Sequence, residues 1–257
     1  MPAAYTHYYF GTQILQNLPE DIRSVISRHR QLFDAGLQGA DFFFYYRPWH
    51  KNAVAALAYT YHRIPGTAFF RDAVSRLSGD EAQRVYLYGV LGHYALDANC
   101  HPYVDACTAE GKCKHAELEA EYDRILLARS GEKAPHRHQI NRHARLTASE
   151  AAVVAPLFPP ATPAQIYESF LTFRILYHAM SSSCRGVVRR LMQRFNQHFL
   201  LMFESPNSHI SGLIPEFDRL YKAALDSYPR LLDSLLKTIK TGEPLTDEFE
   251  KPFDLTY

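Results

Sequence analysis

The chain lacks an excess of charge of either sign. Its 28 Lys and Arg residues nearly balance its 27 Asp and Glu residues, so the formal net charge is +1 over 257 residues. Strong general attraction to nucleic acid or to an anionic membrane requires a marked basic excess. We therefore expect no stable nucleic acid partner.

Long apolar runs and signal sequences are missing as well. No segment reaches the roughly 18 uncharged apolar residues of a membrane-spanning helix, so we predict no transmembrane segment. The opening MPAAYTHYYFG has no basic region followed by an apolar run, the pattern of a secretory signal. Cysteine is scarce, and the four cysteines are expected to be reduced thiols. These features favour a cytoplasmic location, although a secreted form that had lost its signal would have the same sequence.

Sheet-forming patterns are also absent, since the chain has no extended run of strictly alternating β-branched residues and no internal repeat. Apolar residues instead recur every three to four positions, which is typical of amphipathic helices. The predicted helices are 13–18, 21–33, 52–61, 67–77, a buried helix from a cap at 78–80 to 101, 114–128, 164–203 and 214–240. We predict an all-α single domain over residues 1–257, with a ligand-bearing part at 1–130, an exposed loop at 131–146 and helical support at 147–240.

The sequence does contain histidines and acidic residues spaced four positions apart. One stretch reads His93-x3-Asp97-x3-His101, and after a loop His115-x3-Glu119. Residues four apart lie on the same side of a helix. Zinc accepts imidazole nitrogens and carboxylate oxygens together. The stretch therefore predicts a zinc site.

The spacing also predicts more than one ion. Residues four apart lie about 6 Å apart along a helix axis, whereas His93 and His101 lie about 12 Å apart, too far for one ion bound at about 2.0–2.2 Å. His93 and Asp97 would hold one ion, and His101, His115 and Glu119 the next. Because the residue before a proline tends to leave the helix, Pro102 predicts that His101 ends its helix and faces a second one.

The alternative is that these residues lie on helix surfaces by coincidence. Asp97 argues against it, because it stands among Val90, Leu91, Ala95 and Leu96, where an unpaired carboxylate would be costly.

The same region contains an ordered series of motifs that covers roughly the first 125 residues. They are Thr6-His7-Tyr8, the run 39–46 (GADFFFYY), His62-x4-Thr67-x-Phe69-Phe70, the run 88–97 (YGVLGHYALD), His101-Pro102-Tyr103 and His115-x3-Glu119. In this order they resemble the zinc-dependent phospholipase C family, which shares its helical fold with the P1/S1-type nucleases. The resemblance implies the fold of the phospholipase C / P1 nuclease type.

The resemblance also implies two or three zinc ions and a ligand for each. The first ion would be held by Asp41, His62, His93 and Asp97, the second by His101, His115 and Glu119, and the third by His7 and Asp97. His50 also lies between Asp41 and His93 and is the alternative to His62. In secreted members an N-terminal tryptophan completes the third site, whereas this chain starts Met1-Pro2 and has no tryptophan near its start.

The activity implied is zinc-dependent hydrolysis of phosphate esters, most simply phospholipase C-like cleavage of a phosphodiester by a zinc-activated water. Asp41 would orient or deprotonate that water, and Phe42, Phe43 and Tyr46 would line the pocket for a phospholipid or another phosphate ester. Two alternatives remain. One is a single-strand nuclease or phosphatase on the same site, and the other is a non-catalytic protein that uses zinc for stability.

Overall fold

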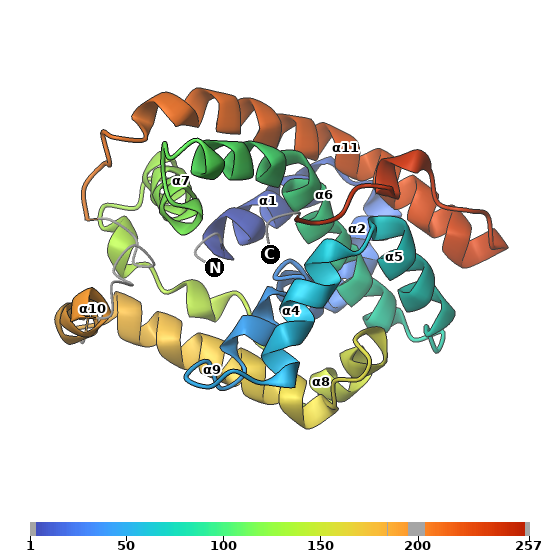
Figure 1. Ribbon diagram of the computed structural model, residues 1–257. Helices are drawn as coiled ribbons and strands as arrows, with labels where there is room; N and C mark the ends of the chain where they lie inside the picture. The colour runs from blue at the N-terminus through green and yellow to red at the C-terminus, as the bar shows by residue number, and fades with distance from the viewer. Residues whose placement is uncertain (1–3, 184, 195–203, 255–257) are drawn as a thin grey trace.

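The computed structural model describes residues 4–183, 185–194 and 204–254, which form a single helical domain (Figure 1). Within these ranges there are eleven α-helices and no strand, and Pro65 and Pro252 form an isolated bridge. The prediction of an all-α single domain is confirmed. The helices are α1 (Ala4–Asn17), α2 (Glu20–Arg28), α3 (Arg30–Gly36), α4 (Ala53–Arg63), α5 (Gly66–Ser75), α6 (Glu81–Ala109), α7 (His115–Arg129), α8 (Ala148–Val154), α9 (Pro163–Ser181), α10 (Arg185–Arg194) and α11 (Ile214–Thr241).

Helix α6 is the centre of the fold, and its most extensive contacts are with α3 and α11. Every side chain from Val85 to Ala98 is buried, so this helix is covered on all sides. Two glycines allow α3 and α6 to approach closely. A Cβ on Gly89 would lie 2.2 Å from the Phe33 carbonyl oxygen, and one on Gly36 would lie 2.3 Å from the Tyr86 oxygen. Only glycine fits at this crossing.

The prediction that the helix ends at His101 is wrong. Helix α6 continues to Ala109 with Pro102 inside it. A proline there removes one backbone hydrogen bond, which is costly but not prohibitive when neighbouring elements hold the helix. Val104 is completely buried, and the Tyr103 hydroxyl donates a hydrogen bond to the Leu213 carbonyl at 3.1 Å. Tertiary contacts therefore hold the helix together beyond the proline.

Other predicted boundaries shift in the same way. The predicted helix 21–33 is two helices, α2 and α3, which meet at His29. The predicted helix 164–203 is α9 followed by α10, and residues 195–203 lie outside the described ranges. The predicted loop 131–146 is not fully exposed, because Ile140, Ala144 and Leu146 are buried against the core. Three of the four cysteines, at 100, 107 and 113, are free thiols, as predicted, and Cys184 lies outside the described residues.

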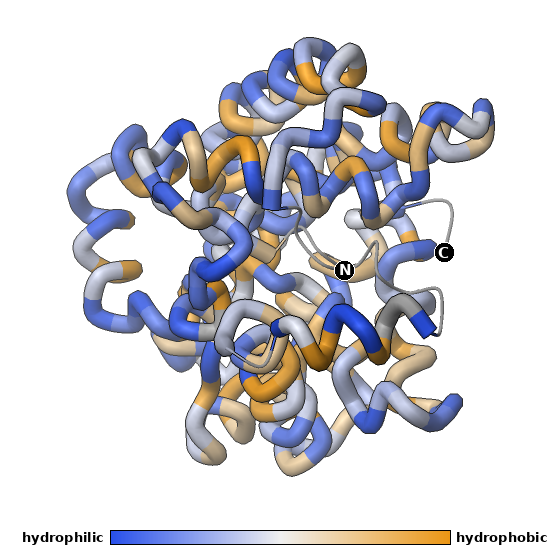
Figure 2. Tube along the Cα trace, turned by 90° about the vertical axis from the view of Figure 1, so that its left-hand side faces the viewer, coloured by the Kyte–Doolittle hydropathy of each residue, from blue (hydrophilic) through white to orange (hydrophobic). Residues whose placement is uncertain are grey.

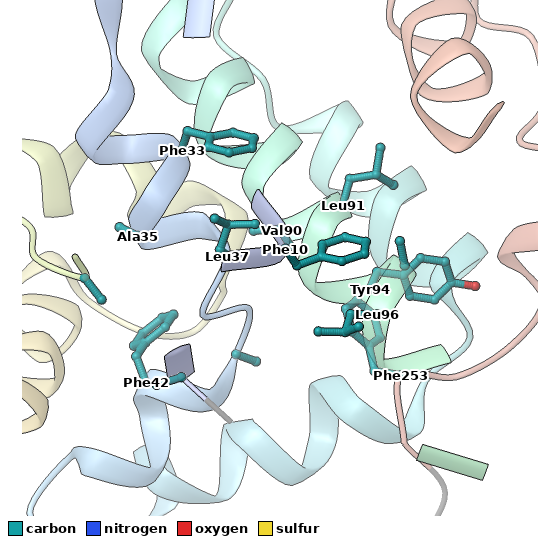
Figure 3. Close-up of a cluster of buried hydrophobic side chains, with 14 of the residues drawn as sticks. Phe10, Phe33, Ala35, Leu37, Phe42, Val90, Leu91, Tyr94, Leu96 and Phe253 are labelled. Atoms are coloured by element: carbon teal, nitrogen blue, oxygen red, sulfur yellow. The ribbon is translucent and has the colours of Figure 1, made fainter. Parts of the chain in front are cut away.

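Apolar and polar residues are interspersed along the chain (Figure 2), and α2, α10 and α11 are amphipathic helices. The core is rich in aromatic rings and joins distant parts of the chain (Figure 3). Phe10 from α1 is completely buried, and Phe253 near the other end of the chain packs 4.8 Å from the ring of Tyr94 in α6. Among the described helices, none combines the length and apolarity needed to cross a membrane.

Candidate metal centre

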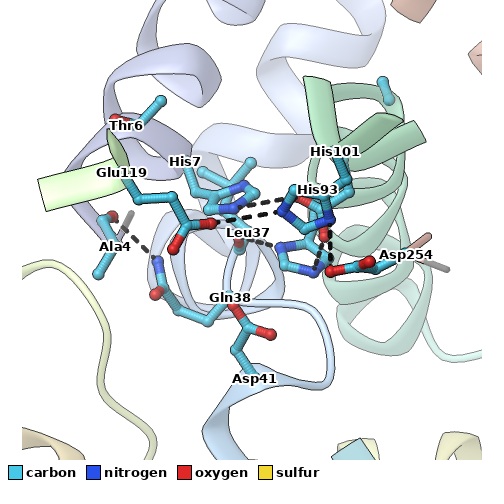
Figure 4. Close-up of polar contacts among 12 residues, drawn as sticks. Ala4, Thr6, His7, Leu37, Gln38, Asp41, His93, His101, Glu119 and Asp254 are labelled. Atoms are coloured by element: carbon cyan, nitrogen blue, oxygen red, sulfur yellow. Dashed lines mark hydrogen bonds and ion pairs between the residues drawn. The ribbon is translucent and has the colours of Figure 1, made fainter. Parts of the chain in front are cut away.

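The structure brings together all eight residues predicted as metal ligands, from five separate elements. Helix α1 contributes one, the 3-10 helix η1 (Asp41–Tyr45) one, α4 one, α6 three and α7 two. All are buried except His115, whose side chain is 17% exposed. Figure 4 shows part of this cluster, with the imidazoles of His7, His93 and His101 and the carboxylate of Glu119 close together.

Asp97 lies at the middle of the cluster, and its two carboxylate oxygens face different imidazoles. Its Oδ2 is 2.9 Å from His93 Nε2 and 3.8 Å from His62 Nε2. Its Oδ1 is 3.3 Å from His7 Nε2 and 3.6 Å from His101 Nε2. A carboxylate in this position can bridge two neighbouring cations.

The first group of potential ligands is Asp41, His62 and His93, whose ligand atoms lie within 4.8 Å of one another. His62 Nε2 is 2.9 Å from Asp41 Oδ1. The other ring nitrogens of the two histidines face backbone carbonyls, His62 Nδ1 that of Ala58 at 2.6 Å and His93 Nδ1 that of Leu37 at 3.2 Å. Since a carbonyl only accepts, both Nδ1 atoms carry the proton and both Nε2 atoms keep a lone pair for a cation.

His50 does not share this environment. It is exposed in the loop before α4, whereas His62 is 1% exposed and lies in the last turn of that helix. Of the two alternatives left by the sequence, the structure places only His62 in the cluster.

The second group lies where α6 passes the start of α7. His115 Nε2 is 3.2 Å from Glu119 Oε1, one helical turn away, and His101 Nε2 is 3.4 Å from the same oxygen. Two carboxylates that the sequence analysis missed face the outer ring nitrogens. Asp254 Oδ2 is 3.1 Å from His101 Nδ1, and Asp105 Oδ1 is 3.4 Å from His115 Nδ1.

The third group is His7, His93 and Asp97, again within 4.8 Å. The rings of His7 and His93 stack with their centroids 4.3 Å apart. His7 lies in the first turn of α1, and that turn is held by Asp123 of α7, which accepts hydrogen bonds from the Thr6 amide at 2.7 Å and the Thr6 hydroxyl at 2.6 Å. Burial raises the pKa of Asp123 to about 8 in spite of these hydrogen bonds.

Of the carboxylates that the sequence analysis missed, two follow the four-residue spacing and one does not. Asp105 extends the series His93, Asp97, His101 by another four residues, and Asp123 extends His115, Glu119 in the same way. Spacing could therefore have found both. Asp254 follows no such series and lies 153 positions from its partner in the fold, so nothing local indicated it.

The charges of the cluster favour a cation. Four buried carboxylates face it: Asp41, Asp97, Glu119 and Asp254. The buried arginines in the described part of the chain, Arg124 and Arg185, pair elsewhere with Glu121 and Glu204.

The pKa values reflect this arrangement. Burial alone would raise the pKa of Asp97, but the surrounding imidazoles lower it well below its usual range. For His7, burial and the neighbouring His93 lower the pKa to about 4. For His115, burial is outweighed by Glu119 and Asp105, which raise the pKa to about 9. At Asp97 and His115 the acidic and basic groups thus stabilise each other's charged forms, whereas His7 is neutral near pH 7, the form in which an imidazole binds a cation.

The donor set fits zinc. Ligand atoms about 2.0–2.1 Å from a tetrahedral zinc are about 3.3 Å from each other, and the contacts within the cluster run from 2.9 to 3.8 Å. Glu119 Oε2 is also buried with no hydrogen-bond partner among the described residues. An isolated buried carboxylate oxygen is costly, and coordination of a cation would satisfy it.

The fold and this cluster define an all-helical protein with a buried multi-metal centre. A family model described as zinc-dependent phospholipase C matches residues 6–154, more than half of the chain and the part that contains all eight predicted ligands. The chain therefore belongs to the zinc-dependent phospholipase C family, a family of phosphoric diester hydrolases, and its cofactor is zinc. No curated protein and no solved structure matches the chain.

The expected pocket lining stays a prediction. Phe42 and Phe43 are almost completely buried among core rings. A groove of about 580 Å³ lies beside the loop before α4 and is lined by Phe44, Pro48, Trp49, His50, Lys51, Asn52, Ala55, Ala56 and Tyr59. The ring of Phe44 lies between this groove and the metal centre, with its centroid 6.1 Å from that of His62.

Proposed function

We propose that the protein hydrolyses the head-group phosphodiester of phospholipids, a phospholipase C reaction, at the buried centre around Asp97. The observation that carries the proposal is the convergence of five imidazoles and three carboxylates at the spacing of zinc ligands, within the region matched by the family. Zinc bound there would lower the pKa of a water molecule and neutralise charge on the phosphate.

The contact distances support the ligand sets that the family resemblance implies. One ion is assigned to Asp41, His62, His93 and Asp97, and a second to His101, His115 and Glu119. Asp97 reaches a third position beside His7 through its other oxygen. His93 can serve one ion only, since its Nδ1 already donates to the Leu37 carbonyl. We therefore expect two tightly bound ions and a third that binds more weakly.

Asp41 is the proposed general base. It begins η1, where the chain leaves α3, and its side chain is 8% exposed against 2% for Asp97. It is thus the carboxylate of the first group nearer to solvent. An oxygen there is within reach of an attacking water and can accept its proton.

The groove beside Phe44 supports a lipid substrate. Trp49 is 66% exposed and Tyr59 43% exposed, so the groove offers apolar ring surface next to the phosphate site. Such rings suit the glycerol and acyl parts of a phospholipid. Exposed rings can also stack on bases, which is the observation that favours a single-strand nuclease as the second candidate. The near-zero net charge gives a nuclease no electrostatic support.

A substrate panel tests the proposal. Zinc-loaded protein is incubated with phosphatidylcholine and phosphatidylethanolamine vesicles, an aryl phosphodiester and single-stranded DNA. We expect release of the phosphorylated head group, loss of activity with a chelator and recovery with added zinc. Faster hydrolysis of DNA than of lipid would establish the nuclease instead. Absence of turnover on every phosphate ester would refute the assignment of a hydrolase.

A further inference from the structure

The segment after α11 runs back across the molecule and is fastened to the helices that carry the metal centre. The Tyr94 hydroxyl of α6 is positioned to donate to the carbonyls of Glu248 and Lys251, at 3.0 and 3.1 Å. The Gly66 amide at the start of α5 donates to the Lys251 carbonyl at 2.9 Å. These contacts fix the course of residues 248–251.

The next residue but one, Phe253, forms part of the wall of the centre. It is 4% exposed, and its ring centroid lies 6.0 Å from that of His93 and 6.1 Å from that of His62. On its other side it packs against Phe69. It also packs against Tyr94 (Figure 3). The segment therefore reaches the ligands of the first group through an apolar contact.

Asp254 then enters the polar part of the site (Figure 4). Its side chain is completely buried, and its amide donates to the His62 carbonyl at 3.1 Å. Its Oδ2 is 3.1 Å from His101 Nδ1, while the opposite nitrogen of that ring, Nε2, faces Glu119 and Asp97. The carboxylate thus lies on the side of the ring away from Glu119 and Asp97, where one of its oxygens is also within 4.8 Å of a ligand atom of His101 and of His115.

We propose that Asp254 is a positioning residue of the metal centre, which accepts the Nδ1 proton of His101 and so holds the Nε2 lone pair toward the second ion. This inference rests on the ligand set given under the proposed function. Because a carboxylate only accepts here, Nδ1 must carry the proton. A carboxylate behind a ligating histidine fixes its tautomer and orientation and raises its basicity.

The consequence is that the metal centre extends beyond the part of the chain that the family model matches. That match ends at residue 154, and Asp254, whose carboxylate lies 3.1 Å from His101 Nδ1, comes a hundred residues later. The ring orientation of a ligand at the middle of the centre thus depends on the docking of segment 248–254. Any change that detaches this segment should therefore weaken the second site.

Two substitutions separate positioning from direct coordination. Asp254→Ala removes the acceptor, whereas Asp254→Asn keeps a carbonyl oxygen that can accept the Nδ1 proton without the charge. The matched control is Glu248→Ala in the same segment, which removes an exposed ion pair with Arg230 and does not touch His101. Zinc bound per chain is measured against zinc buffers, with circular dichroism to confirm folding.

We expect Asp254→Ala to weaken one ion by about 10- to 100-fold, the range typical for such partners. Asp254→Asn should weaken it by less than about tenfold, and Glu248→Ala should leave it unchanged. In ¹⁵N-labelled wild-type protein, His101 should show a protonated Nδ1, and Asp254→Ala should lose that signature.

Equal losses in the Ala and Asn variants would instead identify Asp254 as a direct ligand and overturn the proposal, as would wild-type zinc affinity in Asp254→Ala. If the protein binds zinc as expected but hydrolyses no phosphate ester, the proposed function fails and the role of Asp254 stands.

Discussion

At the scale of single residues, the centre is organised by the atoms behind the imidazoles. His62 and His93 have their Nδ1 atoms against backbone carbonyls, and His101 has its own against a carboxylate. Each ring is therefore fixed in the tautomer that directs Nε2 inward. The carbonyls belong to Ala58, one turn before its histidine, and to Leu37, at the end of α3. The helices themselves thus orient the ligands.

Asp97 is the residue on which most of the centre depends. We predict that Asp97→Asn lowers zinc content at two positions together and abolishes turnover, because one amide cannot replace both carboxylate oxygens. His7→Ala should remove only the weaker third ion and leave measurable activity. Zinc content by mass spectrometry, measured alongside phosphodiester hydrolysis, compares the two variants. Equal and mild effects would contradict a bridging role for Asp97.

The assignment of His62 over His50 can be tested in the same way. His62→Ala removes a buried imidazole 2.9 Å from Asp41. We predict that the first ion binds at least about tenfold more weakly, because loss of a direct ligand should cost at least as much as loss of a residue that supports one. His50→Ala changes an exposed histidine and should keep wild-type zinc affinity, which makes it the matched control. Weaker zinc binding by His50→Ala than by His62→Ala would instead identify His50 as the ligand.

At the scale of elements, α7 holds α1 in place. Asp123 accepts from the amides of Tyr5 and Thr6, two of the backbone donors that a helix leaves unsatisfied in its first turn. Asp123 therefore caps the N-terminus of α1, although it belongs to α7. Its contact with Thr6 fixes the first turn of α1 one residue before His7.

We predict that Asp123→Ala destabilises the chain by about 1–3 kcal/mol, because buried amides lose their acceptor. Asp123→Asn should cost less, since its carbonyl oxygen still accepts from Thr6. Urea unfolding of the zinc-free protein measures both, so that metal loss does not contribute. An Ala variant as stable as the wild type would show that the cap contributes nothing.

The pH dependence of this pair has a defined sign. The pKa of Asp123 is about 8 in the folded chain against 3.8 ordinarily, so the folded state keeps a proton that the unfolded chain loses. Stability therefore falls as pH rises between these values. We predict that the wild type loses free energy of unfolding relative to Asp123→Asn from pH 4 to pH 8. A difference independent of pH would contradict the raised pKa.

The crossing of α3 and α6 positions Leu37 and Asp41 against His93. We predict that Gly89→Ala destabilises the protein by about 1–3 kcal/mol, because the new Cβ would meet the backbone oxygen of Phe33. Gly186→Ala in α10 is the control, since its Cβ would meet nothing within 4 Å. It should be neutral or stabilising by up to about 1 kcal/mol. Thermal unfolding of both variants measures these changes, and equal stability of the two would contradict the close approach of α3 and α6 at Gly89.

At the scale of the whole molecule, the sequence predicted what is local. Side chains four residues apart on one helix indicated the candidate ligands of α6 and α7, because helix geometry alone brings them together. The end of α6 was wrongly predicted, because packing against Leu213 and the core outweighs the local effect of Pro102. Asp254 was missed because only the folding of the whole chain brings it to His101. The cytoplasmic location stays a prediction.

The convergence of five helical elements and segment 248–254 predicts how the fold responds to loss of metal. Without cations, four buried carboxylates share one site, and their mutual repulsion is offset only by imidazoles that must take up protons. Ions that bind only the folded chain stabilise it by about 4 kcal/mol per site at a thousand times the Kd. We therefore predict that a chelator lowers the melting temperature markedly and that zinc restores it. Magnesium should not restore it, because it prefers oxygen ligands to imidazole. An unchanged melting temperature after verified removal of zinc would mean that the imidazoles and carboxylates hold the site together on their own.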